Sequence, residues 1–236
     1  MKRWMSTFVV ACACVAAQAQ YFSTRPGTEL DYVTYDEAGQ SVLNSTVTVT
    51  NVHRQPEKTE VMYFTKRVEN RQTNNTSYTL YYWIHEKGKS VCIEDLMYGP
   101  YIASDSDPAV YNNEIREALR KDLKWKGNNA FALPDHPHAG ESMPDRSWSY
   151  QDGGVLRKQV TITGAAFLGN DSVNTTAGNF NCLKVMYLKR TKEMLKNKTL
   201  RVAEWYAPGV GLVKSESFDM KGRPAGKVLL VGLREK

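Results

Sequence analysis

The residues best able to do chemistry lie in a proline-rich stretch predicted to be a loop over 128–148. Asp135, His136 and His138 stand close together there, and carboxylate and imidazole groups are both common zinc ligands. A zinc site needs three or four ligands that converge on the ion. Because Pro137 separates the two histidines, we expect their rings to diverge. We interpret the stretch as a solvated loop, with a metal site and a metal-assisted hydrolase as the alternatives.

Nucleophilic catalysis is not indicated by the sequence. No Gly-x-Ser-x-Gly motif occurs, and that motif forms the turn that exposes the catalytic serine of α/β-hydrolases. Cys92 and Cys182 lie in apolar strand-like runs, where a thiol is usually unreactive. They could form a disulfide in an oxidising compartment or stay buried thiols. His85 stands isolated in another such run. We therefore predict a protein that is not an enzyme and needs no cofactor.

Aromatic side chains provide the second chemical signal. The candidates for ligand binding are Tyr81, Trp83, Trp148, Trp205 and Tyr206, which lie in strand-like runs. Aromatic residues commonly fill protein cores, and that is one interpretation of this set. In an open or partly closed barrel they would instead line an apolar groove.

The strands that carry these residues are predicted to form β structure that repeats itself. Gly27–Leu30 is echoed by Gly140–Met143, and Val47–Val52 by Val160–Ala165, both 113 residues later. Pro208-Gly209 is a turn dipeptide between two aromatic and β-branched runs, which predicts a hairpin. Short strands with regularly spaced turns are typical of sandwiches and barrels. We predict a mainly β protein, with antiparallel sheets forming an incomplete or paired β-barrel or sandwich from two similar units.

One α-helix is predicted to bridge the two units, over residues 107–127. Asp107 can cap its N-terminus, an apolar stripe recurs at helical spacing, and Gly127 can end it. The first β unit would span 20–106, and the loop and second unit 128–236. Together, residues 20–236 would form one compact domain.

The N-terminus has the anatomy of an export signal. Lys2 and Arg3 precede an apolar run, and a small-x-small cleavage site ends at Ala19. We expect residues 1–19 to be a signal peptide and the mature protein to be periplasmic or secreted. A lipid anchor at Cys12 is the competing interpretation. No later run reaches the ~20 apolar residues of a membrane-spanning helix, so we expect no transmembrane span.

The charge of the chain does not indicate a nucleic-acid partner. The formal net charge is +6, but the basic residues are spread along the sequence and form no recognisable nucleic-acid-binding module. The densest run, 184–201, alternates cations with apolar residues and is interpreted as the solvated face of strands. We expect no nucleic acid, and a lipid, an apolar small molecule or an envelope protein as the partner.

Several segments resemble the family of exported Bacteroidetes proteins called DUF3108-like, a domain of unknown function. The likeness covers nearly the whole chain after the signal peptide. It rests on Gly27–Leu30 with Tyr32, Cys92–Met97, Met143–Asp145, Thr176–Cys182 and Trp205–Glu216. The resemblance implies an all-β envelope protein and supplies no catalytic residues. Asp171-Ser172-Val173 also resembles the O-glycosylation motif of exported Bacteroidetes proteins, with Ser172 as the acceptor.

These observations predict an exported envelope protein that binds an apolar or amphipathic ligand, such as a lipid, without catalysis. The alternative is a structural or interaction protein of envelope assembly that has no small-molecule ligand. A continuous cavity would favour the ligand-binding protein, and a filled interior with an exposed apolar patch would favour the interaction protein.

Overall fold

The fold is built from β-strands. The computed structural model describes residues 20–69, 76–94, 124–152, 155–193 and 196–235, and no helix occurs in these ranges. The strands are β1 (Glu29–Tyr35), β2 (Ser41–Gln55), β3 (Lys58–Glu69), β4 (Thr76–Glu86), β5 (Lys89–Glu94), β6 (Lys126–Gly127), β7 (Phe131–Pro134), β8 (Arg146–Asp152), β9 (Val155–Thr175), β10 (Gly178–Glu193), β11 (Lys196–Ala207), β12 (Gly211–Phe218) and β13 (Pro224–Arg234). The prediction of a mainly β protein is confirmed.

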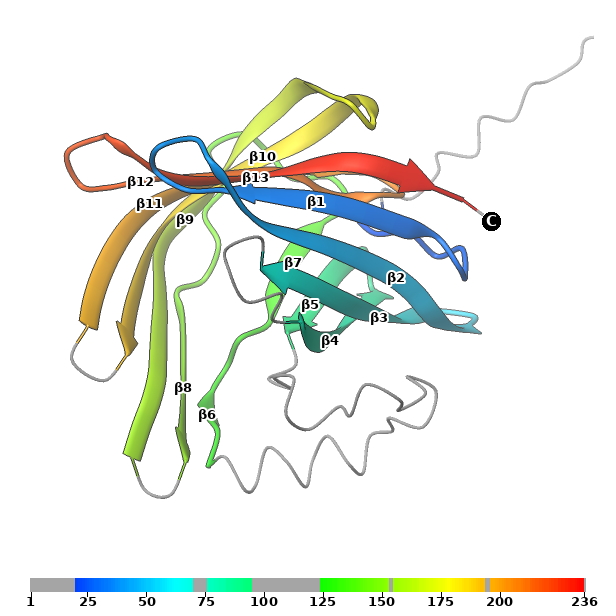
Figure 1. The fold of residues 1–236 in the computed structure, drawn as a ribbon. Helices are drawn as coiled ribbons and strands as arrows, with labels where there is room; N and C mark the ends of the chain where they lie inside the picture. The colour runs from blue at the N-terminus through cyan, green and yellow to red at the C-terminus, as the bar shows by residue number, and fades with distance from the viewer. Residues whose placement is uncertain (1–19, 70–75, 95–123, 153–154, 194–195, 236) are drawn as a thin grey trace, which may run out of the picture.

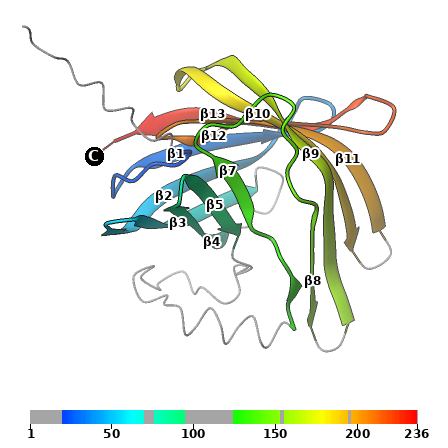
Figure 2. The ribbon, with the colours of Figure 1, turned by 180° about the vertical axis from the view of Figure 1, so that it is seen from behind.

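The strands form one continuous antiparallel sheet in the described part of the chain. Its order is β6-β8-β9-β10-β11-β12-β13-β1-β2-β3-β4-β5-β7. The sheet is not closed, and its two edge strands, β6 and β7, are consecutive in sequence. Two views half a turn apart show β8, β9 and β11 on one side and β2 to β5 on the other, with β12, β13 and β1 between them (Figures 1 and 2). We call these two sides the arms of the sheet.

Two predicted boundaries in the middle of the chain are wrong. Most of the helix expected over 107–127 lies in 95–123, outside the described residues, but its last two residues form strand β6. Gly127 has φ 91°, and a Cβ at this position would lie 2.1 Å from the Ser147 carbonyl oxygen. This glycine therefore lets the backbone approach β8. The loop expected over 128–148 contains β7 and the start of β8.

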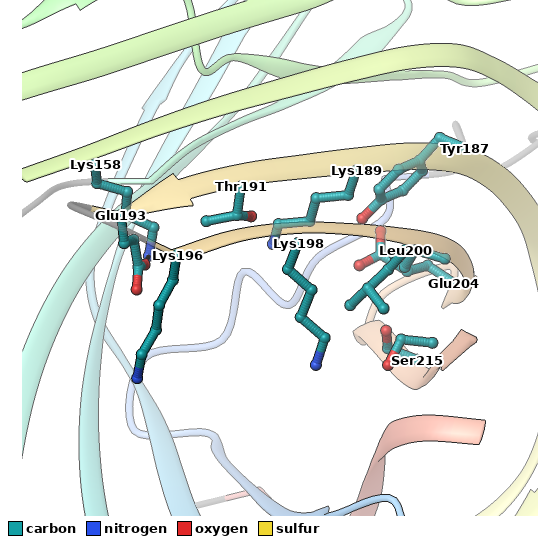
Figure 3. A pocket seen from close by; sticks show the side chains of 12 residues that line it. Lys158, Tyr187, Lys189, Thr191, Glu193, Lys196, Lys198, Leu200, Glu204 and Ser215 are labelled. Carbon is teal, nitrogen blue, oxygen red and sulfur yellow. Dashed lines mark ion pairs between the residues drawn. The ribbon is translucent and has the colours of Figure 1, made fainter. Parts of the chain in front are cut away.

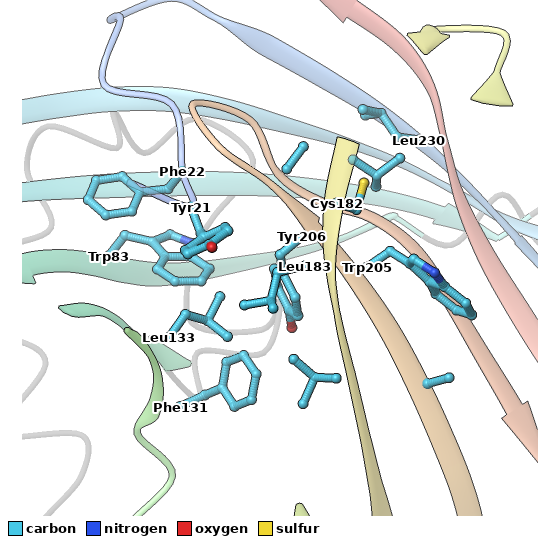
Figure 4. Packing of buried hydrophobic residues seen from close by; sticks show 14 of the residues in the cluster. Tyr21, Phe22, Trp83, Phe131, Leu133, Cys182, Leu183, Trp205, Tyr206 and Leu230 are labelled. Atoms are coloured by element: carbon cyan, nitrogen blue, oxygen red, sulfur yellow. The ribbon is translucent and has the colours of Figure 1, made fainter. Parts of the chain in front are cut away.

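The interior joins the two arms through aromatic packing. The Phe22 and Trp83 rings stack with centroids 5.4 Å apart, and Trp83 meets Tyr206 edge-on at 6.3 Å. The Phe131 ring lies 5.3 Å from that of Tyr206 (Figure 4). All four side chains are buried. Since Phe22 comes before the first strand, the segment that follows the predicted signal peptide is part of the core.

The sequence echo corresponds to two similar turns, but only in part. Gly27 and Gly140 both have positive φ, 80° and 86°. Their amides donate to Val49 and Phe167 respectively. Glu29 pairs with Thr48, whereas Ser142, 113 residues after Glu29, pairs with Ala166, 118 residues after Thr48. The second strand of the echo is therefore displaced by five residues from the predicted match at Val160–Ala165.

Candidate functional site

A pocket opens on one face of β9 to β12, with a cavity volume of about 430 Å³. Twelve residues line it: Lys158, Tyr187, Lys189, Thr191, Glu193, Lys196, Lys198, Leu200, Val202, Glu204, Ser215 and Ser217. We call it the lysine groove, and the face of the strands that carries it the inner face. Figure 3 shows Lys189, Lys198, Leu200 and Glu204 projecting from neighbouring strands into this space.

Strand register explains why these side chains share a face. Arg146 of β8 pairs with Ile162 of β9, and Ile162 pairs with Lys189 of β10. Lys189 in turn pairs with Leu200 of β11. Directly paired residues in an antiparallel sheet point to the same side. The four residues therefore make one row across the inner face, and Arg146 stands at the β8 end of that row.

The groove carries an excess of positive charge. It contains four lysines and two glutamates. Lys158 Nζ lies 3.1 Å from Glu193 Oε1. Among the described residues, no ion pair involves Lys189, Lys196 or Lys198. A concave surface of one charge sign raises the local concentration of oppositely charged solutes, so the groove can attract an anion.

A polar group borders the groove at its buried end. The Tyr206 hydroxyl donates to Glu204 Oε2 at 2.8 Å. Burial, together with the nearby Glu204 carboxylate, raises the pKa of Tyr206 well above 10, so the phenol remains a donor. Tyr187 and Val202 are buried neighbours that line the same end of the groove. Hydrogen-bonding and apolar surface are therefore available side by side.

Arg146 lies beside this end. Its guanidinium carbon is 4.6 Å from the Phe131 ring centroid and 5.9 Å from that of Tyr187. The Nε atom is buried and has no hydrogen-bond partner among the residues that the structure describes. Desolvation lowers the pKa of Arg146, against the opposite effect of Tyr187, Tyr206 and Glu204. No local pattern in the sequence points to Arg146, because the strand pairing that places it beside the groove joins distant segments.

The predicted metal ligands are divided between the interior and the surface. Asp135 is buried, and its two carboxylate oxygens lie 3.0 and 3.1 Å from Nε2 of the buried His85. His136 and His138 are exposed and border a second pocket of about 350 Å³. Within the described ranges, no group of three or more His, Cys, Asp and Glu residues could hold a metal ion. His85 is therefore a paired residue, and its partner lies 50 positions away in sequence.

No disulfide joins Cys92 and Cys182, the two cysteines in the described part of the chain, so the bridge that the sequence allowed is not formed in the structure. Cys92 is on β5 and Cys182 on β10, two strands that are not neighbours in the sheet. Burial, with a smaller effect of Asp171, raises the pKa of Cys182 to about 12. Cys182 is therefore expected to be an unreactive core thiol.

The predicted ligand-binding aromatics pack in the structure instead of lining the lysine groove. Trp83 and Tyr206 belong to the core, and Trp148 is half-buried against it. Trp205 lies on the other side of β11 from Tyr206 (Figure 4), where its Nε1 donates to Asp171 Oδ2 at 2.9 Å. Lys184 and Lys214 cover the Trp205 ring at 4.8 and 4.4 Å from its centroid. The side chain of Tyr81 is outside the described part.

Successive residues along β10 and β11 lie on opposite faces of the sheet, and this spacing could have predicted which lysines share a face. The run over 184–201 is predicted to be a solvated strand face, and Lys196 and Lys198 are exposed as that implies. Its cations divide between two faces, however: Lys189, Lys196 and Lys198 line the lysine groove, whereas Arg190 and Lys192 line a pocket on the opposite face. Adjacent strand residues point to opposite faces, so counting every second residue separates the two sets.

Ser172, the predicted glycosylation acceptor, is exposed on β9.

Comparisons with known proteins identify relatives of this fold. The sequence profile of the DUF3108-like family matches residues 25–230. A solved structure of an exported-protein candidate from Bacteroides fragilis, with a YmcC-like fold, is similar at a TM-score of 0.71 and 20% identity, covering 92% of this chain and all of the other. A lipoprotein candidate from Parabacteroides distasonis is similar at 0.70 and 20% identity, covering 92% of this chain and 99% of the other. No relative was found among curated proteins.

In the ranges that the structure describes, no helix has the length and apolar character needed to cross a bilayer.

Proposed function

The chain belongs to the DUF3108-like family, and we propose that it is an exported, non-enzymatic binding protein for an amphipathic molecule with an anionic group. The lysine groove is the observation that carries this proposal. Its volume of about 430 Å³ lies within the range of roughly 300–1,000 Å³ that is usual for small-molecule sites.

The composition of the groove favours an amphipathic ligand over a purely apolar one. Three lysines without an ion-pair partner in the described ranges, Lys189, Lys196 and Lys198, can attract and hold an anionic group. Leu200 and Val202 follow on the same face of β11 and offer apolar contact to a hydrocarbon segment. An envelope lipid with a charged head group has both properties.

The test is calorimetric titration of the mature protein, without detergent, with dodecyl phosphate below its critical micelle concentration. Dodecyl maltoside is the matched uncharged amphiphile. We expect dodecyl phosphate to bind and dodecyl maltoside to bind at least tenfold more weakly, because electrostatic attraction acts only on the charged head group. Added salt should weaken binding of the phosphate. Equal affinities for the two amphiphiles would remove the anionic part of the proposal.

A pair of double variants distinguishes the groove from the general charge of the protein. Lys189→Gln with Lys198→Gln removes two groove lysines, and Lys192→Gln with Arg201→Gln removes two exposed cations from the opposite face. We expect the groove variant to bind dodecyl phosphate at least tenfold more weakly, and the matched variant to bind within twofold of the natural sequence. Equal losses would locate binding elsewhere. No binding to the natural sequence would favour an interaction protein.

A further inference from the structure

Arg146 is a half-buried charged residue that has no polar partner in the described structure. A guanidinium carries five N–H donors. Among the described residues none accepts a hydrogen bond from Arg146 or forms an ion pair with it, and its Nε is buried. Its contacts are the faces of Phe131 and Tyr187. These rings stabilise a cation but cannot accept hydrogen bonds as an oxyanion would.

Leaving the buried Nε unpaired costs stability. A buried N–H without an acceptor costs about 1–3 kcal/mol, and more when the group is charged. Glu204 favours the Arg146 charge electrostatically, but this carboxylate accepts the Tyr206 hydroxyl and forms no ion pair with Arg146 in the described ranges. An unbranched apolar side chain could fill the same space between the rings without the desolvation cost. The arginine is therefore better explained by a ligand than by packing.

The position of Arg146 shows what that ligand could reach. Arg146 and Lys189 stand in one register row with only Ile162 between them. Two inter-strand spacings separate their backbones by roughly 10 Å. Both side chains are long enough to extend over Ile162 and meet one group between them. Tyr187, which Arg146 contacts, lines the groove itself.

We propose that Arg146, together with Lys189, binds a phosphate group at the β8 side of the lysine groove. The planar fork of a guanidinium matches two oxygens of a phosphate, and a lysine supplies a second positive charge. This inference rests on the proposed function and names the head group of its ligand. Glu204 lies on the same face and opposes the anion, so the site depends on the excess of cations that the four lysines provide.

The test combines a binding measurement with a stability measurement on Arg146→Met. Methionine keeps an unbranched side chain between Phe131 and Tyr187 but has neither charge nor donors. We expect dodecyl phosphate to bind at least tenfold more weakly, and the melting temperature of the ligand-free protein to stay the same or rise. Lys192→Met, on the opposite face, is the control for loss of one charge and should change the affinity by less than twofold.

Arg146→Lys keeps the positive charge but removes the planar guanidinium. This variant provides the test if Arg146→Met fails to fold. We expect it to lose at least fivefold in affinity, because an ammonium cannot contact two oxygens in the same fixed geometry. Full affinity in a folded Arg146→Met or in Arg146→Lys would overturn the role of the guanidinium and leave the proposed function standing. A lower melting temperature with unchanged binding would show that Arg146 is a packing residue.

Two further outcomes show whether the ligand is free phosphate or the phosphate head group of an amphiphile. If inorganic phosphate binds as tightly as dodecyl phosphate and Arg146→Met weakens both, the phosphate site stands and the amphipathic ligand of the proposed function is wrong. If the natural sequence binds neither, the inference and the proposed function are both overturned.

Discussion

Two sites in the described structure remove ionisable groups from water, and their surroundings differ. His85 and Asp135 are buried together, with both carboxylate oxygens within 3.1 Å of the imidazole Nε2. Arg146 is half-buried against two aromatic rings, and its buried Nε has no hydrogen-bond partner among the described residues. A buried polar group is normally satisfied, so the first site is complete without a ligand. At the second site, the Arg146 Nε gains a hydrogen-bond acceptor only if a ligand binds.

The residues around the two sites differ in the same way as the sites themselves. Around the His85–Asp135 pair the polar groups are satisfied within the chain: the Tyr21 amide donates to the buried Ser90 hydroxyl, and the Asp135 amide donates to the Gly88 carbonyl. We call this the closed region for that reason, although Tyr21 and Asp135 also border the pocket beside His136. Beside Arg146 the inner face opens into the lysine groove, which we call the open region. One sheet therefore carries a region whose polar groups are paired internally and a region with cations that have no ion-pair partner in the described ranges. Substitutions in the first should change stability, and those in the second should change affinity.

The largest effect is expected for Phe22→Ala in the closed region. Phe22 is 1% exposed and stacks on Trp83, and truncating such a residue typically costs about 3–5 kcal/mol. We expect a loss of about 4 kcal/mol in the free energy of unfolding, measured by urea denaturation. Met220→Ala, at a side chain 50% exposed, is the control and should change it by less than about 0.5 kcal/mol. A loss below about 1 kcal/mol for Phe22→Ala would mean that the N-terminal segment is not part of the closed region.

The next effect tests the paired site directly. Asp135→Ala leaves the buried His85 without its hydrogen-bond partner, and an unsatisfied buried polar group costs about 1–3 kcal/mol. We expect a loss of about 2 kcal/mol in the same denaturation experiment. His136→Ala, at the exposed neighbouring position, should be nearly neutral. If Asp135→Ala costs no more than Arg146→Met, the contrast between the paired and the unpaired site is wrong.

The sequence predicted local features of this architecture better than long-range ones. The hairpin around Pro208-Gly209 is present as β11, a turn at Gly209 with φ 72°, and β12, because a turn dipeptide acts on adjacent residues. The His85–Asp135 pair and the row from Arg146 to Leu200 depend on pairing between distant strands. No local pattern reports such a register. The inner lysines carried a usable signal, since their spacing by twos assigns them to one strand face.

The smallest effect on stability is expected in the open region. Lys189→Gln with Lys198→Gln removes two cations that form no ion pair in the described ranges, so the free energy of unfolding should stay within about 0.5 kcal/mol of the natural value. Removing like charges that share a groove can even stabilise the protein slightly at low salt. That gain should disappear as added salt screens the repulsion. Urea denaturation at 20 mM and 500 mM sodium chloride measures both effects. A loss above about 1 kcal/mol would show that these lysines help to hold the arm together. The groove would then belong to the region that stabilises the fold, and the division between closed and open regions would fail on the face where a ligand is proposed to bind.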